Sequence, residues 1–191
     1  MKNLSDQELM RIVQGGDHAP ASEIYDRYSA RIYNFALRFL RNTEAAEDAT
    51  QEVFVKMLKH AKQFQGDAKL STWLFSITAN WCRDYLRKAD NKTKESDDVL
   101  ATLPASGESP ERMLERRENE VLVRRALMTL TPEQREAILL SRYQGLSYAE
   151  IAQISGCSEG AVKTRVFRAM ETLKKTLAGE ARGGDRCLTV S

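Results

Sequence analysis

Histidine, cysteine and long apolar runs are all scarce in this chain of 191 residues. Only two histidines and three cysteines occur, and Cys82, Cys157 and Cys187 form no C-x-x-C pair and have no histidine pair nearby. This spacing favours neither a disulfide framework nor a zinc site, so we expect no bound metal and no cofactor. Scattered free thiols are typical of a reducing cytoplasm, which is the location that we predict.

Features of membrane proteins and of enzymes are also missing from the sequence. No apolar run approaches the roughly 20 residues that cross a bilayer, and the first ten residues lack the hydrophobic core of a secretory signal. There is no G-x-x-x-x-G-K-[ST] nucleotide loop. With only two histidines, the chain has few candidates for the general base that activates a catalytic nucleophile. We therefore predict no direct membrane insertion, no catalytic residues and no enzymatic activity.

Charge is nearly balanced overall, but it is unevenly distributed along the chain. The net charge is only +2, whereas residues 93–118 carry 7 acidic and 4 basic side chains between two mildly basic blocks. Ser, Pro, Asp and Gly collect in the same stretch, which has little apolar surface to offset the entropy of ordering. The sequence predicts a domain at 1–92, a flexible acidic linker at 93–118, a second domain at 119–178 and a tail at 179–191 without an assignable role.

Both blocks have the apolar spacing of helices, and no period-two alternation indicates a strand. Capping boxes at Ser5–Glu8 and Thr131–Gln134 mark two helix starts. Between them the spacing predicts helices over 21–41, 43–62, about 71–88 and 115–130. The apolar side of the 43–62 helix is expected to consist of Val53, Phe54, Met57 and Leu58. The expected fold class is all-α.

The most informative segment is GLSYAEIAQISGCSEGAVKTRVFRAMETLKK, residues 145–175, which has the pattern of a helix-turn-helix. Ala152 is small where the two helices would cross. Gly156 stands where the first helix must end in a left-handed turn that suits glycine. Val162 stands where the second helix must pack back on the first. These three steric requirements together favour a helix-turn-helix over an ordinary charged helical hairpin.

Capping residues and the two distinct faces of the second helix support this interpretation. Ser147 with Glu150 forms a capping box, and Ser158 can cap the second helix. Helical spacing separates an apolar face (Val162, Val166, Met170, Leu173) from a second face (Lys163, Thr164, Phe167, Arg168). A solvated face needs no phenylalanine, so Phe167 between cations indicates contact with base edges or thymine methyls. We predict that this segment binds DNA.

Two further segments leave a structural and a functional interpretation open. Aromatic residues and cations gather over 64–88, a combination that holds single-stranded nucleic acid, although a core stripe with a solvated back explains it as well. Acidic residues follow Thr43. The first of them suit a helix start, whereas Asp48, Gln51 and Glu52 lie further along and are equally compatible with docking on a basic partner helix.

Together these segments resemble the bacterial RNA polymerase sigma factors of the extracytoplasmic-function, or sigma-E-like, group of the sigma-70 family. The matching residues are EDATQEVFVKMLKHAKQF (47–64), GDAKLSTWLFSITANWCRDYLRK (66–88) and 130–175. The resemblance implies one helical domain for the −10 promoter element (region 2) and one for the −35 element (region 4). It also implies a factor without catalytic activity that gives core polymerase its promoter specificity.

The resemblance assigns roles to individual positions. At the −10 element it implies DNA contacts by Phe64, Phe75, Ile77, Asn80, Arg83 and Arg87, with Trp73 and Trp81 largely in the core. At the −35 element it implies base readout by Lys163, Thr164, Phe167 and Arg168 and a phosphate contact by Arg165. Relatives commonly have arginine at the position of Lys163, and lysine lacks the bidentate fork, so we expect a weaker guanine preference there.

The resemblance also implies protein partners. Docking on the clamp coiled coil of the largest polymerase subunit would use Asp48, Gln51, Glu52 and Val53. The flap of the second subunit, promoter DNA and an anti-sigma factor are the other partners implied, and the linker resembles the segment that threads toward the polymerase active site.

Three alternatives stay open at this stage. A polymerase-independent helix-turn-helix regulator would need a receiver or sensor domain in residues 1–92, where no strand periodicity occurs. An enzyme with a DNA-binding tail lacks a catalytic constellation. A degenerate paralogue would still bind its partners but would not initiate transcription. Only a transcription assay with reconstituted polymerase distinguishes it from an active sigma factor.

Overall fold

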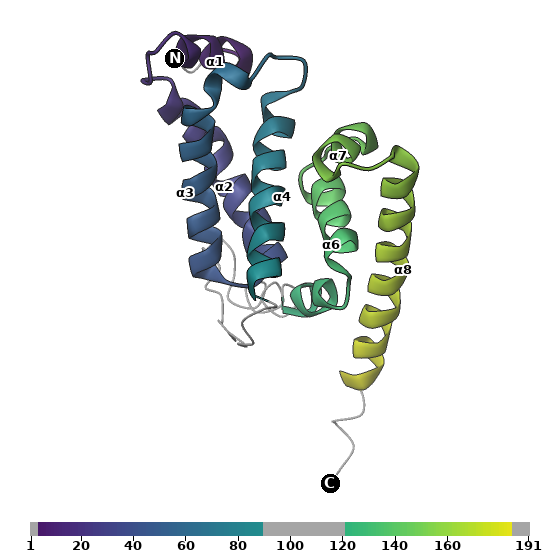
Figure 1. Cartoon of the computed structure of the whole chain (residues 1–191). Coiled ribbons are helices and arrows are strands. Elements are labelled where there is room, and N and C mark those ends of the chain that lie inside the picture. The colour runs from purple at the N-terminus through teal and green to yellow at the C-terminus, as the bar shows by residue number, and fades with distance from the viewer. Residues whose placement is uncertain (1–3, 90–120, 185–191) are drawn as a thin grey trace.

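The computed structural model describes residues 4–89 and 121–184, and within these ranges every regular element is helical (Figure 1). The all-α prediction is thereby confirmed. The predicted linker at 93–118 and Cys187 lie outside the described residues. No helix in the described ranges combines the length and the apolar character that crossing a membrane requires.

The N-terminal module (residues 4–89) is a helical bundle. Its elements are α1 (Asp6–Gln14), α2 (Ala21–Leu40), α3 (Thr43–Lys59), the 3-10 turn η1 (Ala61–Gln63) and α4 (Leu70–Ala89). Figure 1 shows α2, α3 and α4 side by side, with α1 lying across one end of them.

The C-terminal module (residues 121–184) begins with a helix over 121–128. It continues with α6 (Pro132–Ile138), a π-helical turn η2 (Leu139–Tyr143), α7 (Tyr148–Ser155) and α8 (Glu159–Gly184). In Figure 1 α7 lies against α4, and α8 forms the outer edge of the molecule.

Local sequence signals explain most of the helix ends. Both predicted capping boxes are present. The side chains of Glu8 and Gln134 accept hydrogen bonds from the backbone N–H groups of Ser5 and Thr131, respectively. In return, the hydroxyls of Ser5 and Thr131 accept from the backbone N–H groups of Glu8 and Gln134. The helix expected over 21–41 ends at Leu40, because Arg41 takes a left-handed conformation with φ of 56°. The helix expected over 43–62 also ends early, at Lys59, and η1 replaces its last turn.

The core of the N-terminal module is aromatic at its centre. Phe35 stacks on Phe39 with ring centroids 5.8 Å apart, and it meets the edge of Phe75 at the same distance. Met57 of α3 is fully buried in the same hydrophobic cluster. One prediction about α3 is wrong: Leu58 was expected on its apolar side, but 37% of its surface is exposed.

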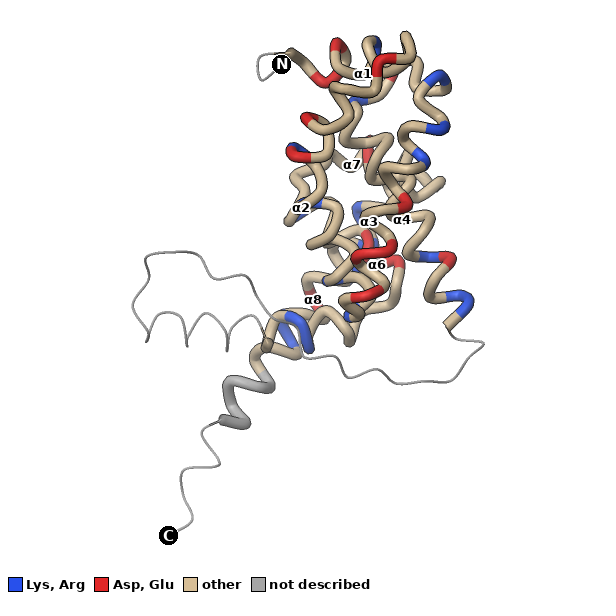
Figure 2. The backbone as a smooth tube through the Cα atoms, turned by 90° about the vertical axis from the view of Figure 1, so that its left-hand side faces the viewer, with Lys and Arg blue, Asp and Glu red and all other residues tan. Residues whose placement is uncertain are grey.

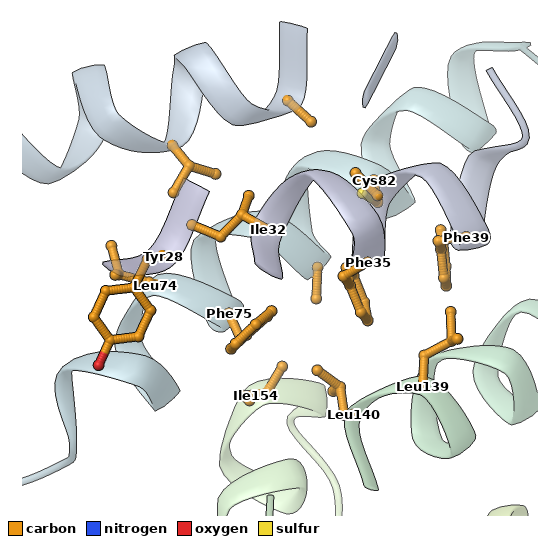
Figure 3. Close-up of a cluster of buried hydrophobic side chains, with 14 of the residues drawn as sticks. Tyr28, Ile32, Phe35, Phe39, Leu74, Phe75, Cys82, Leu139, Leu140 and Ile154 are labelled. Atoms are coloured by element: carbon orange, nitrogen blue, oxygen red, sulfur yellow. The ribbon is translucent and has the colours of Figure 1, made fainter. Parts of the chain in front are cut away.

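The two modules share one continuous hydrophobic core. Figure 3 shows Phe35 and Phe75 facing Leu140 and Ile154 of the other module, and all four side chains are buried. Because apolar side chains of both modules exclude water from the same volume, each module stabilises the other in this arrangement.

A buried guanidinium also joins the two modules by hydrogen bonds. Arg135 of α6 is 5% exposed, and it donates hydrogen bonds to the carbonyl oxygens of Leu127 (3.0 Å), Leu130 (3.1 Å) and, across the module boundary, Phe39 (2.8 Å). Burial lowers the pKa of Arg135, and the nearby charge of Arg41 lowers it further. The three carbonyls lie at or beyond the ends of helices, where backbone acceptors have fewer partners within the helix.

Candidate nucleic-acid and partner interfaces

The predicted helix-turn-helix is present, with both of its caps. Ser147 and Glu150 form the capping box of α7, and Gly156 ends that helix in the left-handed conformation with φ of 62°. Ser158 Oγ accepts from the backbone N–H of Ala161 (3.2 Å) at the start of α8. Val162 is fully buried, so α8 packs back on α7 as the steric pattern predicted.

The opposite face of α8 is open to solvent. Lys163, Thr164, Phe167 and Arg168 are all exposed. Phe167 is 63% exposed, more than any other large apolar side chain in the described residues. Arg165 lies apart from this face, because it is half-buried and its guanidinium approaches Cys157 Sγ at 3.4 Å. The structure therefore groups four of the five predicted −35 residues on one surface.

The cap residue Glu150 also joins the two modules. Its carboxylate accepts from the backbone N–H and the hydroxyl of Ser147, both at 2.8 Å, and it pairs with Lys69 Nζ of the N-terminal module at 3.1 Å. Thr72 Oγ1 donates to it as well, at 3.2 Å. The backbone hydrogen bond from Ser147, with smaller contributions from its hydroxyl and from Lys69, lowers the pKa of Glu150 to about 2.

This depressed pKa predicts an acid-sensitive contribution to stability. The carboxylate stabilises the fold fully above its unfolded pKa, and the contribution is lost as pH falls from there toward about 2. We expect Glu150→Gln to cost about 1–2 kcal/mol of unfolding free energy near neutral pH and progressively less below about pH 4. Urea unfolding at several pH values measures the difference, and a cost independent of pH would contradict the assignment to the carboxylate charge.

The predicted −10 residues on and before α4 fall into two groups. Phe64 and Phe75 are 6% and 0% exposed, which places both rings in the core of this arrangement rather than at its surface. Phe64 packs against Trp73, with ring centroids 5.3 Å apart. Trp73 and Trp81, expected largely in the core, are half-buried, and Trp81 stacks on Tyr85.

The remaining −10 residues are Ile77 and three polar side chains, Asn80, Arg83 and Arg87, of which Arg83 and Arg87 face the C-terminal module. Asn80 is exposed and Ile77 is half-buried. Arg83 donates to Asn80 Oδ1 and is ion-paired with Glu136 of α6, whereas the exposed Arg87 pairs with Asp84 at 3.0 Å. A cavity of about 330 Å³ opens between the modules here, lined by Arg83, Leu86, Arg87, Pro132, Glu133, Glu136, Ser155 and Arg165. Sequence reasoning missed Glu136, because no local signal pairs it with Arg83.

The acidic surface of α3 is accessible. Asp48 and Gln51 are exposed, and the half-exposed Glu52 pairs with Lys56 at 3.7 Å. Figure 2, in which α3 faces the viewer, shows acidic positions along this helix. Val53, predicted in the same docking set, is fully buried, so it can support this surface but cannot contact a partner directly.

Three exposed apolar side chains near this surface were not predicted. Val55 and Leu58 of α3 are 40% and 37% exposed, and Tyr25 of α2 is 48% exposed with its ring 4.7 Å from that of Phe54. Helical spacing could have predicted the exposure of Val55. It lies four positions after Gln51 and three after Glu52, and it therefore shares their side of the helix.

Two packed helical modules, the second with a cationic helix-turn-helix surface, define the class of helix-turn-helix proteins. Family models narrow this class. The model described as "Sigma-70 region 2" matches residues 24–92, and that described as "Sigma-70, region 4" matches residues 120–173.

Curated relatives are similar in sequence over almost the whole chain. The RNA polymerase sigma-H factor of Pseudomonas aeruginosa is 32% identical over 180 residues, which cover 90% of this chain and 93% of that protein. The ECF RNA polymerase sigma-E factor of Escherichia coli K12 is 33% identical over 181 residues, covering 90% and 94%. The chain belongs to the sigma-70 family of transcription initiation factors, within its extracytoplasmic-function group.

Two solved structures have a similar fold. One is the sigma factor RpoE in complex with the anti-sigma factor NepR from Bartonella quintana, with a TM-score of 0.67 at 27% identity over 82% of this chain and 96% of that one. The other is CnrH in complex with the cytosolic domain of CnrY, with a TM-score of 0.69 at 24% identity over 91% and 97%.

Proposed function

We propose that this sigma factor binds core RNA polymerase in the cytoplasm and directs it to promoters through two DNA contacts. The module with α8 reads the −35 element as duplex, and the module with α4 captures unpaired bases of the −10 element. The observation that carries the proposal is the exposed face of α8, where Phe167 and the cations Lys163 and Arg168 beside it are open to solvent.

At the −35 element α8 enters the major groove and reads base edges directly. Lys163 and Arg168 suit guanine acceptors, and Phe167 suits a thymine methyl. Arg165 is assigned to a backbone phosphate, a role that requires it to turn away from Cys157. Phosphate contacts fix the register and base contacts carry the specificity.

At the −10 element Asn80, Ile77, Arg83 and Arg87 form the proposed contact surface. Phe64 and Phe75 take part either by supporting this surface from the core or after the loop rearranges, because both are buried here. Unpairing a base costs a few kcal/mol, and a pocket for one extruded base offsets part of that cost. Melting by capture needs no nucleotide hydrolysis.

Docking on polymerase is assigned to the acidic surface of α3. Asp48, Gln51 and Glu52 supply a negative face for the clamp coiled coil, with Val53 packed beneath them. The C-terminal module is assigned to the flap of the second subunit. Control by an anti-sigma factor is proposed as well, supported by the likeness to RpoE, whose solved structure contains the anti-sigma factor NepR.

Run-off transcription with reconstituted core polymerase on a library of promoters tests this function. We expect transcripts from a subset of promoters when both chain and core are present, and none from either alone. If the chain bound operators unaided and failed to associate with core polymerase at any ionic strength, the polymerase-independent regulator would be correct instead.

Removing one proposed −35 reader should weaken discrimination between promoters. We expect Arg168→Ala to cost about 1–3 kcal/mol of promoter discrimination, because the exposed guanidinium reads a base. Holoenzyme binding to cognate and mismatched −35 duplexes measures the effect. Glu171→Ala, an exposed change on the same helix, is the matched control. A uniform loss on both duplexes would assign Arg168 to a phosphate rather than to a base.

A further inference from the structure

Residues of four helices line the cavity between the modules. In Figure 1 α6 lies between α4 and α8, and the cavity is found where α6 begins. Its volume of about 330 Å³ is at the lower end of the range of about 300–1,000 Å³ that is typical of small-molecule sites. The lining consists of three guanidiniums, two carboxylates, one hydroxyl and two apolar side chains (Arg83, Arg87, Arg165; Glu133, Glu136; Ser155; Leu86, Pro132). The space therefore suits a compact ligand, and most of its lining residues are charged.

One of the two carboxylates is already compensated within the protein. Arg83 Nη1 lies 2.7 Å and 2.8 Å from the two carboxylate oxygens of Glu136, and Ser155 Oγ donates to the same carboxylate at 2.6 Å. A carboxylate with these partners has little charge left to repel an anion in the cavity. Arg83 is occupied as well, since its Nη2 donates to Asn80 Oδ1. The pair of Arg83 and Glu136 is thus an electrically neutral part of the wall.

The other two guanidiniums are available to a stronger acceptor. Arg165 of α8 is half-buried, and its Nη1 donates to Cys157 Sγ at 3.4 Å. A thiol sulfur is a weak acceptor, so this contact uses little of the hydrogen-bonding capacity of a guanidinium. The side chain of Arg87 on α4 is 76% exposed, and its ion pair with Asp84 at 3.0 Å is a surface pair that an anion can displace at little cost.

Glu133 is the exposed carboxylate among the eight lining residues. Hydrogen bonds from its own backbone and from Thr131 lower the pKa of Glu133, and the charge of Arg165 lowers it further. Arg165 is therefore close enough to act on a negative charge in the cavity. Because Arg83 and Glu136 neutralise each other, two guanidiniums face one carboxylate across this space, and the balance favours an anion.

We propose that the cavity is a binding site for a compact phosphate-bearing molecule of about the size of a nucleoside diphosphate, held between Arg87 and Arg165. The two planar guanidiniums belong to different helices. A phosphate presents oxygens on several sides, whereas a carboxylate presents two oxygens in one plane, so a phosphate suits this pair better. Leu86 and Pro132 supply an apolar side for the rest of the molecule. The site is independent of the proposed role at promoters.

Isothermal titration calorimetry on the full chain, in buffer free of magnesium and phosphate, tests the site. The probe is adenosine diphosphate (ADP), and adenosine is the comparison without phosphate. We expect saturable binding of one ADP molecule per chain, no binding of adenosine, and a thermal unfolding midpoint that rises with ADP concentration. Absence of ADP binding at concentrations of about 1 mM would overturn the proposal.

One pair of variants separates this site from the cationic face of α8, where polyanions can also bind. We expect Arg165→Ala to weaken ADP binding about tenfold or more, because it removes charge-assisted hydrogen bonds. Arg168→Ala removes the same charge from the same helix and should leave the ADP affinity unchanged, because Arg168 is not part of the lining. Equal weakening by the two variants would assign ADP to the α8 face and overturn the proposal.

Two further variants keep the test decisive if Arg165→Ala fails to fold, as judged by circular dichroism. Arg87→Ala truncates a largely exposed side chain and should weaken ADP binding about fivefold. Glu133→Gln removes the opposing charge and should tighten binding about threefold. Unchanged affinity in either variant would overturn the proposal. Run-off transcription without added ADP tests the proposed function separately, so either idea can fail alone.

Discussion

Phe35→Ala is expected to lower the free energy of unfolding by about 3–5 kcal/mol and to destabilise both modules together. Phe35 is 1% exposed, contacts the rings of Phe39 and Phe75, and faces the C-terminal module across the shared core. Truncation removes an aromatic side chain where neighbours from two modules cannot all collapse into the space.

Denaturant unfolding followed by circular dichroism and by tryptophan fluorescence measures this change. Tyr25→Ala on the same helix is the control, and we expect it to cost about 1 kcal/mol, because half of that side chain is already exposed. One cooperative transition should shift as a whole. Two transitions, with only the N-terminal one shifted, would show that the shared core contributes little to stability in solution.

Charge reversal on α3 should have the largest effect on assembly. We expect Asp48→Lys with Glu52→Lys to weaken binding to core polymerase roughly 100-fold, about 3 kcal/mol, because two attractive contacts become repulsive. Stability should change little, since Asp48 is exposed and the Glu52–Lys56 pair is a surface ion pair at 3.7 Å.

Equilibrium binding to core polymerase at two salt concentrations measures this effect. The control reverses two exposed acids elsewhere, Asp67→Lys with Glu171→Lys, and changes net charge by the same amount. Equal weakening of the two double variants would mean that overall charge, rather than the α3 surface, governs docking.

The predictions that succeeded rest on interactions within a few residues of the chain. Three capping boxes and the left-handed Gly156 follow from side chains that bond the nearest backbone groups or relieve local crowding. The exposed face of α8 follows from helical periodicity, which separates Phe167 from the buried Val162 and Val166. The prediction that Leu58 is buried with the apolar side of α3 was wrong. Leu58 lies at the edge of that side, where helical periodicity does not determine whether a side chain is buried.

Other features depend on residues that are distant in sequence. Arg83 and Glu136 are 53 positions apart, and Lys69 and Glu150 are 81 apart, so no periodicity could have paired them. The burial of Phe75 follows from Phe35 packing against it from another helix, whereas the pattern of α4 alone was compatible with a core or a DNA-facing role.

By itself, the amino-acid order determined the helices, their caps, the helix-turn-helix and the residues that face outward from α8, because these depend on short-range sterics and hydrogen bonds. Only the tertiary structure decided which −10 residues are buried and that the modules share a core. It also decided that Arg83 bonds a carboxylate of the other module. Such contacts arise when surfaces far apart along the chain exclude water together, and a buried charge then takes whatever counter-charge that packing brings near.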